Sequence, residues 1–218
     1  MVFSGILFVL RTGVAWRDLP ERYGKWPTVY GRFRRWCREG LFLRLLALVA
    51  RRARGRLRHL DCSHIKLHQH GANPAGGQCA QAIGRSKGGL NTKLAAAVDA
   101  RGRAVAVALA PGQQHDSKAV LPLLPALRAS RVVGDKAFAT QAFYRRLRRQ
   151  RAQACLPPKR GERLNAPFHR GYYRCRHRVE NFFCRLKRFR RIATRYDKLA
   201  ETFLGFVQLA AVLDWLSA

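Results

Sequence analysis

The spacing of apolar and polar positions changes along the chain and divides it into two parts. Up to about residue 50, apolar residues recur at helical spacing among aromatic and basic ones, and Pro20, Gly24 and Pro27 interrupt the pattern. We expect residues 1–52 to form a small helical bundle, which could be of the helix-turn-helix type. Its aromatic residues could fill the bundle's core or contact a nucleic acid, and the pattern leaves both interpretations open.

From residue 56 the pattern becomes that of strands. The turn signal Asp99-Ala-Arg-Gly102 joins two apolar runs as a hairpin, and two short apolar runs follow, separated by a helix that ends near residue 149. We expect five strands, at residues 57–67, 92–98, 104–110, 131–135 and 152–156. A hairpin-built edge combined with parallel crossovers predicts an α/β fold, with a ribonuclease-H-like mixed five-stranded sheet flanked by helices.

Two later helices are expected on the same grounds. Asp116 or Ser117 can cap a helix that runs through residues 121–127. A longer helix over residues 173–187 has two faces at a period of 3.6 residues. One face carries Arg176, Glu180, Phe183 and Lys187, and the opposite stripe carries Val179, Phe182, Leu186 and Phe189. We expect this helix to pack by its apolar stripe and to present a single carboxylate among cations.

The charge balance indicates the partner. The chain has 43 Lys and Arg against 12 Asp and Glu, a formal net charge of +31, yet 48% of its residues are hydrophobic. Such a basic, core-forming protein is best explained by a polyanionic partner, and we expect a nucleic acid to bind with a sequence-independent Kd of roughly 10⁻⁴ to 10⁻⁶ M. A codon bias that favours arginine would account for only part of this excess.

The cysteines and the apolar runs indicate the compartment. The six cysteines show no CxxC pair, which fits a reduced, cytoplasmic setting. None of the apolar runs reaches the roughly 20 residues that span a bilayer, so we expect no membrane segment and no leader peptide.

Three of the few acidic residues are placed where they could meet. Asp61 lies inside the first expected strand, Asp135 at the end of the fourth, which should neighbour the first, and Glu180 on the late helix. Carboxylates about 4 Å apart would repel by about 4 kcal/mol per pair at an effective dielectric of 20, so they require a cation. Oxygen ligands favour two Mg²⁺ ions, with Mn²⁺ as a substitute, a pair that promotes in-line attack at a phosphodiester. Taken singly, Asp61 could be a solvated strand residue and Asp135 a strand-end cap.

Other motifs support weaker hypotheses. Residues 84–89 are glycine-rich and basic, but Leu90 stands where a phosphate loop requires lysine, so we expect a loop that approaches DNA or a plain connector. The pair His115-Asp116 could be a dyad, although a helix start explains it more simply. A possible zinc cluster has no usual finger spacing, and its members are Cys62, His64, His68, His70 and Cys79.

One signature resembles a known family. Tyr173, Arg176, Glu180 and Lys187 match the Y-(2)-R-(3)-E-(6)-K signature of the DDE transposases encoded by bacterial insertion sequences. Five further segments look like parts of the same family: residues 16–20, 60–64, 84–93, 133–138 and 190–198. The resemblance therefore extends over nearly the whole chain, and the order of its motifs is more specific than any one of them.

The resemblance implies a function. Residues 56–218 would form the catalytic domain, with Asp61, Asp135 and Glu180 as metal ligands. Tyr173, Arg176 and Lys187 would contact the element's end near the scissile phosphate. Family members cut at terminal inverted repeats and join the 3′ hydroxyl to target DNA, so the implied partners are both DNAs and, because two ends are joined, a second copy of the chain in a homodimer.

Two expectations remain conditional. Family members usually carry a further N-terminal segment, so residues 1–52 are expected to be a truncated DNA-binding domain, which puts inverted-repeat binding and activity in question. The alternatives are a degraded transposase that only binds DNA and a ribonuclease-H-like nuclease that cuts but never joins. In each case we expect a bacterial cytoplasmic, nucleoid-associated protein.

Overall fold

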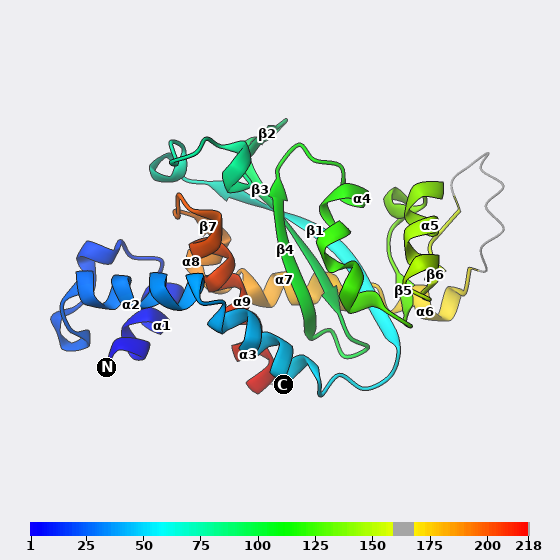
Figure 1. Ribbon diagram of the computed structural model, residues 1–218, viewed down its shortest axis with the longest axis horizontal. Helices are drawn as coiled ribbons and strands as arrows, with labels where there is room; N and C mark the ends of the chain where they lie inside the picture. Colours follow the sequence, from blue (N-terminus) through cyan, green and yellow to red (C-terminus); the bar gives the residue numbers. More distant parts are fainter. Residues whose placement is uncertain (159–167, 218) are drawn as a thin grey trace.

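A mixed β-sheet with helices on both faces forms the centre of the molecule (Figure 1). The computed structural model describes residues 1–158 and 168–217. One face of the sheet is covered by the helices that contain both ends of the described chain, and a smaller group of helices covers the other. No helix within these two ranges is both long enough and apolar enough to span a bilayer.

The sheet has the expected strand order. The central strand β1 (Leu57–Leu67) pairs antiparallel with β3 (Gly89–Val98), which pairs antiparallel with β4 (Ala104–Pro111). On its other side β1 pairs in parallel with β5 (Arg131–Val133), and β5 pairs in parallel with β6 (Gln153–Cys155). If the five expected strands are numbered by their order along the chain, they lie in the sheet in the order 3-2-1-4-5. This order confirms the ribonuclease-H-like mixed sheet.

Two short strands were not expected. β2 (Gly84–Ser86) pairs antiparallel with the start of β3, so the glycine-rich segment forms a hairpin, and the prediction of a loop there was wrong. β7 (Thr194–Arg195) pairs in parallel with the end of β1 through Lys66 and Leu67. This second pairing ties the chain that follows the late helix to the strand that carries Asp61.

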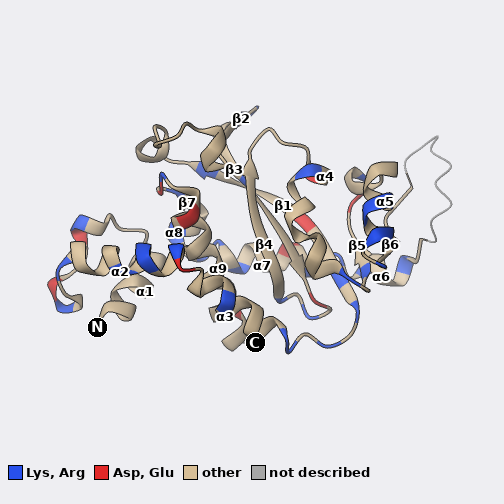
Figure 2. Ribbon diagram, viewed as in Figure 1, with Lys and Arg blue, Asp and Glu red and all other residues tan. Residues whose placement is uncertain are grey.

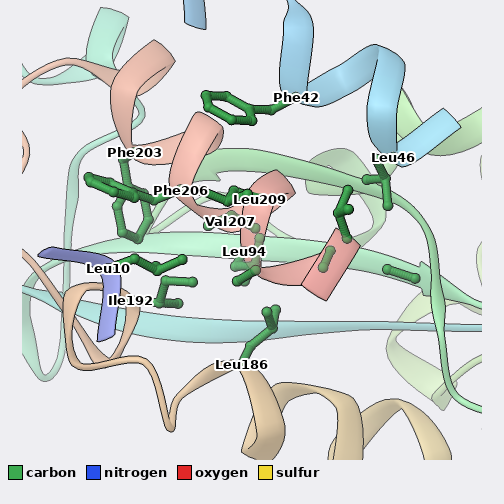
Figure 3. Close-up of a cluster of buried hydrophobic side chains, with 14 of the residues drawn as sticks. Leu10, Phe42, Leu46, Leu94, Leu186, Ile192, Phe203, Phe206, Val207 and Leu209 are labelled. Carbon is green, nitrogen blue, oxygen red and sulfur yellow. The ribbon is translucent and has the colours of Figure 1, made fainter. Parts of the chain in front are cut away.

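The first fifty residues pack against the C-terminal helix, and the last of their helices also packs on the sheet. α2 (Trp26–Arg38) and α3 (Leu41–Ala50) contact α9 (Ala200–Leu216), and α3 also contacts β4. α1 (Val2–Thr12) packs against α2 and against the short helix α8 (Arg190–Ala193). In Figure 3, Phe203, Phe206 and Leu209 of α9 lie among side chains from these helices and from the sheet. The Phe33 ring stacks on the Phe206 ring with centroids 4.2 Å apart. Phe33 therefore fills the core, and Trp16, Trp26 and Trp36 pack against this core while remaining partly exposed.

The opposite face is covered by short helices. α4 (Asp116–Ala119) is followed by the 3₁₀ segment Leu121–Leu127 and, after β5, by α5 (Gln141–Arg149). The residue that caps α4 is His115, whose ring accepts a hydrogen bond from the Ser117 N–H, so the assignment of Asp116 or Ser117 as the cap was wrong. Further 3₁₀ turns occupy Trp16–Asp18, Glu21–Tyr23, Gln69–Gly71, Cys79–Gln81 and Lys136–Phe138.

The late helix is broken in two. α6 (Arg170–Arg174) ends before Cys175, and α7 (His177–Leu186) begins after Arg176; α8 (Arg190–Ala193) follows. Tyr173 and Glu180 therefore lie on different helices, which corrects the expectation of one continuous helix. Phe183 was expected on the polar face, but it is buried in the core together with Val179, Phe182 and Leu186.

Candidate active site

Asp61, Arg176 and Glu180 form a connected cluster between β1 and the start of α7. The guanidinium group of Arg176 donates to the Asp61 carboxylate at 2.8 Å and to the Glu180 carboxylate at 2.5 Å. Asp61 is largely buried, with its side chain 15% exposed, whereas half of the Glu180 side chain is exposed. One cation thus bridges two of the three acidic residues that the sequence singles out.

Asp135 lies two residues beyond the end of β5, the strand that pairs with the one carrying Asp61. The parallel register of β1 and β5 pairs His59 with Val133, and the same register continued for two more residues would bring Asp135 level with Asp61. A Cβ atom added to Gly134 would lie 3.5 Å from the Leu60 carbonyl oxygen, so the chains remain adjacent beyond the end of β5. The Asp135 carboxylate accepts the Lys136 N–H at 2.5 Å and caps the following 3₁₀ turn.

The electrostatics link all three acidic residues to Arg176. Burial alone would lower the pKa of Arg176, but the negative charges of Asp61, Glu180 and Asp135 outweigh it and raise that pKa above its ordinary value. Burial raises the pKa of Asp61; Arg176 and the Cys62 N–H oppose this change only in part. The site therefore holds a carboxylate that is costly to keep charged and a guanidinium that is firmly protonated.

The donor atoms fit divalent cations, although the arginine now holds two of the carboxylates together. Carboxylate oxygens are the ligands that Mg²⁺ and Mn²⁺ prefer. Within the described ranges, no three His, Cys, Asp or Glu side chains are arranged to hold a metal ion. Arg176 is the positive group that binds both Asp61 and Glu180, so a metal ion coordinated by these two residues would take over its hydrogen-bonding partners.

The other two residues of the signature have separate surroundings. The Lys187 ammonium donates to Ser63 Oγ at 2.8 Å and to the His64 carbonyl oxygen at 3.3 Å, on the strand that carries Asp61. The Tyr173 ring packs edge-to-face against Phe168 with centroids 5.4 Å apart. Arg176 and Lys187 therefore both contact β1, while Tyr173 lies on α6.

The residues of the proposed zinc cluster have ordinary partners. His64 Nδ1 lies 2.9 Å from the Asn91 side-chain oxygen, and the His68 ring packs against Tyr196 with centroids 4.7 Å apart. All six cysteines are free thiols. These contacts favour the interpretation of hydrogen-bonded, packed histidines over that of a metal cluster.

Two further charged residues near the acids were missed. Lys93, nearly buried on β3, donates to the Asp116 carboxylate at 2.5 Å and to the Gln114 carbonyl oxygen at 2.6 Å. The charge of Asp116 contributes to the raised pKa of Asp61, so this pair belongs to the surroundings of the site. The signal in the sequence was a single lysine directly before the apolar run Leu94–Val98 of β3.

His59 was also overlooked. It lies two residues before Asp61 on β1, is fully buried, and neither ring nitrogen has a hydrogen-bond partner among the described residues. Burial, reinforced by the positive charges of Arg178 and His177, lowers its pKa to about 4. His59 is therefore neutral at pH 7 and adds no charge to the site.

Comparisons with known proteins agree with this geometry. Residues 53–215 match the family model described as "Transposase DDE domain", and residues 1–46 match "Putative transposase of IS4/5 family (DUF4096)". The chain is 35% identical over 131 residues to "Putative transposase for insertion sequence element IS6501" from Brucella ovis, a match covering 58% of this chain and 99% of that relative. It is 36% identical over 72 residues to "Uncharacterized protein y4sN" from Sinorhizobium fredii, covering 33% of this chain and 58% of that protein.

The solved structures that match are distant. A Mos1 transposase paired-end complex with the left transposon end has a TM-score of 0.31 at 12% identity, covering 85% of this chain and 77% of that one. A pre-cleavage Mos1 transpososome has a TM-score of 0.32 at 14% identity, covering 100% of this chain and 78% of that one. The strand order, rather than these matches, establishes the fold.

Proposed function

This chain belongs to the DDE transposase family, and we propose that it cuts DNA at the ends of an insertion sequence and joins the freed 3′ hydroxyl to target DNA. The observation that supports this reaction most is the bridge that Arg176 makes between Asp61 and Glu180. The register of β1 and β5, continued past the end of β5, would bring Asp135 level with Asp61, and the charge of Asp135 acts on Arg176 together with those of Asp61 and Glu180. Both observations support a site that uses all three carboxylates.

Asp61, Asp135 and Glu180 would hold two Mg²⁺ ions, with Mn²⁺ as a substitute. When bound, such ions activate the attacking oxygen and stabilise the leaving oxygen of an in-line displacement. The sheet fixes the two aspartates, while Glu180 is half exposed and can adjust on α7. Only the attacking oxygen differs between hydrolysis and strand transfer, so one set of carboxylates can serve both steps.

Arg176 would change partners during the reaction. While it bridges Asp61 and Glu180, it compensates two negative charges in a partly buried site. Once cations neutralise those carboxylates, its planar guanidinium group is available to a phosphate, to which it can donate two parallel hydrogen bonds. Lys187 and Tyr173 would position the same DNA end, Lys187 from its place beside Ser63.

The proposed domains, partners and location follow from the same proposed function. Residues 56–218 would be the catalytic domain and residues 1–52 part of a DNA-binding domain, acting on double-stranded DNA in a homodimer. The net charge of +31 supports a polyanionic partner, and the free thiols suit a reducing cytoplasm in which the protein would associate with the nucleoid.

The experiment that tests this function uses a donor duplex that carries the element's terminal inverted repeats, supplied with Mg²⁺ and a target plasmid. A transposase releases the 3′ hydroxyl and yields joined products of donor and target. Cut donor without any joined product would instead indicate a nuclease, and binding without cutting would indicate a protein that only binds DNA. Either of those two results would overturn the proposal.

A further inference from the structure

An arginine-lined pocket lies at the end of the sheet where β1, β5 and β6 begin. Its volume is about 530 Å³, and its lining includes Arg56, Arg131, Arg151, Gln153 and Tyr172. In Figure 2 basic positions gather on α5, near α6 and along the segment that enters β1, all at this end of the molecule. The pocket is separate from the acidic site described above.

The strand order explains why these residues meet. Arg56 precedes β1, Arg131 is the first residue of β5, and Gln153 is the first residue of β6, so parallel pairing brings the three starts to one edge. The Arg131 N–H donates to the Arg56 carbonyl oxygen at 2.7 Å. Asp61 follows Leu57 by four residues of strand, which corresponds to about 13 Å.

Among the described residues, nothing neutralises the charges of this pocket. None of the lining residues within the described ranges is acidic, and no ion pair found there involves Arg56, Arg131 or Arg151. The Arg131 guanidinium group instead donates to the Tyr172 hydroxyl and, at 3.2 Å, to the Gln153 side-chain oxygen. It also lies over the Tyr172 ring, 5.2 Å from the centroid.

The backbone around the pocket adopts a costly conformation. Ala129 and Arg151, which both line it, have φ values of 52° and 54°. Residues with a Cβ atom rarely adopt this left-handed region, and such strain tends to persist where a function requires it. Here it occurs at a residue that contributes one of the three guanidinium groups.

We propose that this pocket binds a backbone phosphate of the DNA on which the acidic site acts, an inference that rests on the proposed function. Guanidinium groups match phosphate oxygens in geometry and charge, and three arginines line this pocket without a carboxylate among its described lining residues. At a rise of about 3.4 Å per nucleotide, a separation of about 13 Å places the bound phosphate about four nucleotides from the acidic residues. Tyr172 acts as a positioning residue because it holds Arg131 in place.

The test measures binding of a fluorescently labelled duplex to Glu180→Gln protein, so that no DNA is cut. The double variant Arg56→Gln/Arg151→Gln is compared with Arg145→Gln/Arg148→Gln, which removes the same charge from exposed positions of α5 that do not line the pocket. We expect the pocket variant to bind about tenfold more weakly, with a slope of log K against log salt that is smaller by about 1 to 2. The control variant should stay within about twofold, and both should melt like the parent protein.

Two further measurements test the role of Tyr172 and distinguish DNA binding from the binding of free anions. Tyr172→Phe should weaken binding a few-fold while the salt slope stays the same, because no charge is lost. Inorganic phosphate is added to the parent protein in a melting assay. If phosphate raises Tm through the pocket arginines while the pocket variant binds DNA normally, the pocket binds free anions and the proposal is overturned.

Equal losses of DNA affinity in the pocket and control variants would also overturn the proposal, since only the overall positive charge would then matter. Unchanged DNA affinity in both variants would overturn it as well. These outcomes are independent of cleavage. If the wild-type protein cleaves DNA while the pocket variant binds DNA normally, the pocket proposal is refuted and the transposase function stands. If the wild-type protein does not cleave DNA while the pocket variant shows the expected loss of binding, the transposase function is refuted and the pocket proposal stands.

Discussion

Arg176 donates a hydrogen bond to Asp61 across 115 residues of sequence, at 2.8 Å, and binds Glu180 with the same guanidinium group. This relationship makes Arg176 the positive partner of two carboxylates that we propose as metal ligands. In this arrangement the arginine neutralises the two acidic residues, and under the proposed function divalent cations would take its place.

The first prediction concerns this competition. Arg176→Gln removes a positive charge that lies between the ligands, so the DNA-free protein should bind Mn²⁺ about tenfold more tightly. Isothermal titration calorimetry measures this affinity, and Arg188→Gln, an exposed charge change after α7, is the matched control. Weaker Mn²⁺ binding by Arg176→Gln than by the control would show that the arginine supports the metal site rather than competing for it.

The second prediction concerns the stability contribution of Asp61. Burial raises the pKa of its carboxyl in the folded protein above the value of 3.8 that serves as reference for the unfolded chain. Folding thus disfavours the charged carboxylate. The resulting loss of stability is fully present at a pH above the pKa of Asp61 in the folded protein, and it disappears at a pH below the pKa of Asp61 in the unfolded chain. Asp61→Asn should therefore raise Tm at pH 7, by about 2–4 °C for each kcal/mol relieved.

The advantage of Asp61→Asn should shrink as the pH falls toward 3.8, because the wild-type carboxyl then becomes protonated. Thermal melts of both proteins across this range measure the difference. A variant that is less stable than wild type at pH 7 would mean that the ion pair with Arg176 outweighs the burial cost.

The third prediction separates two roles of Lys187. Its ammonium group contacts Ser63 and the His64 carbonyl, yet we expect its charge to act mainly on DNA. Lys187→Gln should weaken duplex binding roughly tenfold and lower the salt slope by about 1, with little change in Tm. Ser63→Ala, which removes one of the two protein partners of Lys187 but keeps the charge, should bind DNA within about twofold of wild type. The opposite pattern, a large loss of Tm with unchanged DNA affinity, would make Lys187 structural.

The fourth prediction concerns the buried ion pair that joins α8 to the segment after β7. Arg191 and Asp197 are both about 95% buried and form two hydrogen bonds of 3.0 Å, and Arg191 also donates to the Val14 carbonyl oxygen. Asp197→Ala leaves a buried guanidinium group without its counter-charge, so the free energy of unfolding should fall by about 3–5 kcal/mol.

Urea denaturation measures this loss, and the exposed pair Arg35–Glu39 provides the contrast. Glu39→Ala should cost at most about 0.5 kcal/mol, because exposed pairs at this helical spacing contribute little. Similar losses in both variants would show that burial does not strengthen the Arg191–Asp197 pair.

Much of the fold could be predicted because its signals are local. The alternating run at residues 57–67 coincides with β1, and the Asp99–Gly102 turn joins β3 to β4 as expected. The strand order follows from hairpins and parallel crossovers, and it places Asp61 on β1 and Asp135 just after the neighbouring strand β5. The position of Glu180 on a helix was likewise readable from the spacing of apolar residues.

The remaining features depend on contacts that the local pattern does not encode. The helix breaks between Arg174 and His177 although neither a proline nor a glycine stands at the break, and there Arg176 reaches a strand 115 residues earlier. Phe183 was assigned to the wrong face because the apolar stripe of a core helix is wide enough to include it. The arginine pocket joins the starts of three strands, which only the assembled sheet brings together.

The central claim is that Asp61, Asp135 and Glu180 act together as metal ligands for DNA cleavage, and cleavage by Glu180→Gln tests it most directly. Glu180 is half exposed, so the substitution should leave the fold intact. With Mg²⁺ and a duplex bearing the element's end, the variant should cut at least about 100-fold more slowly, because a lost ligand removes several kcal/mol of transition-state stabilisation. Its DNA affinity should stay within about twofold of wild type. Cleavage at the wild-type rate would contradict the claim.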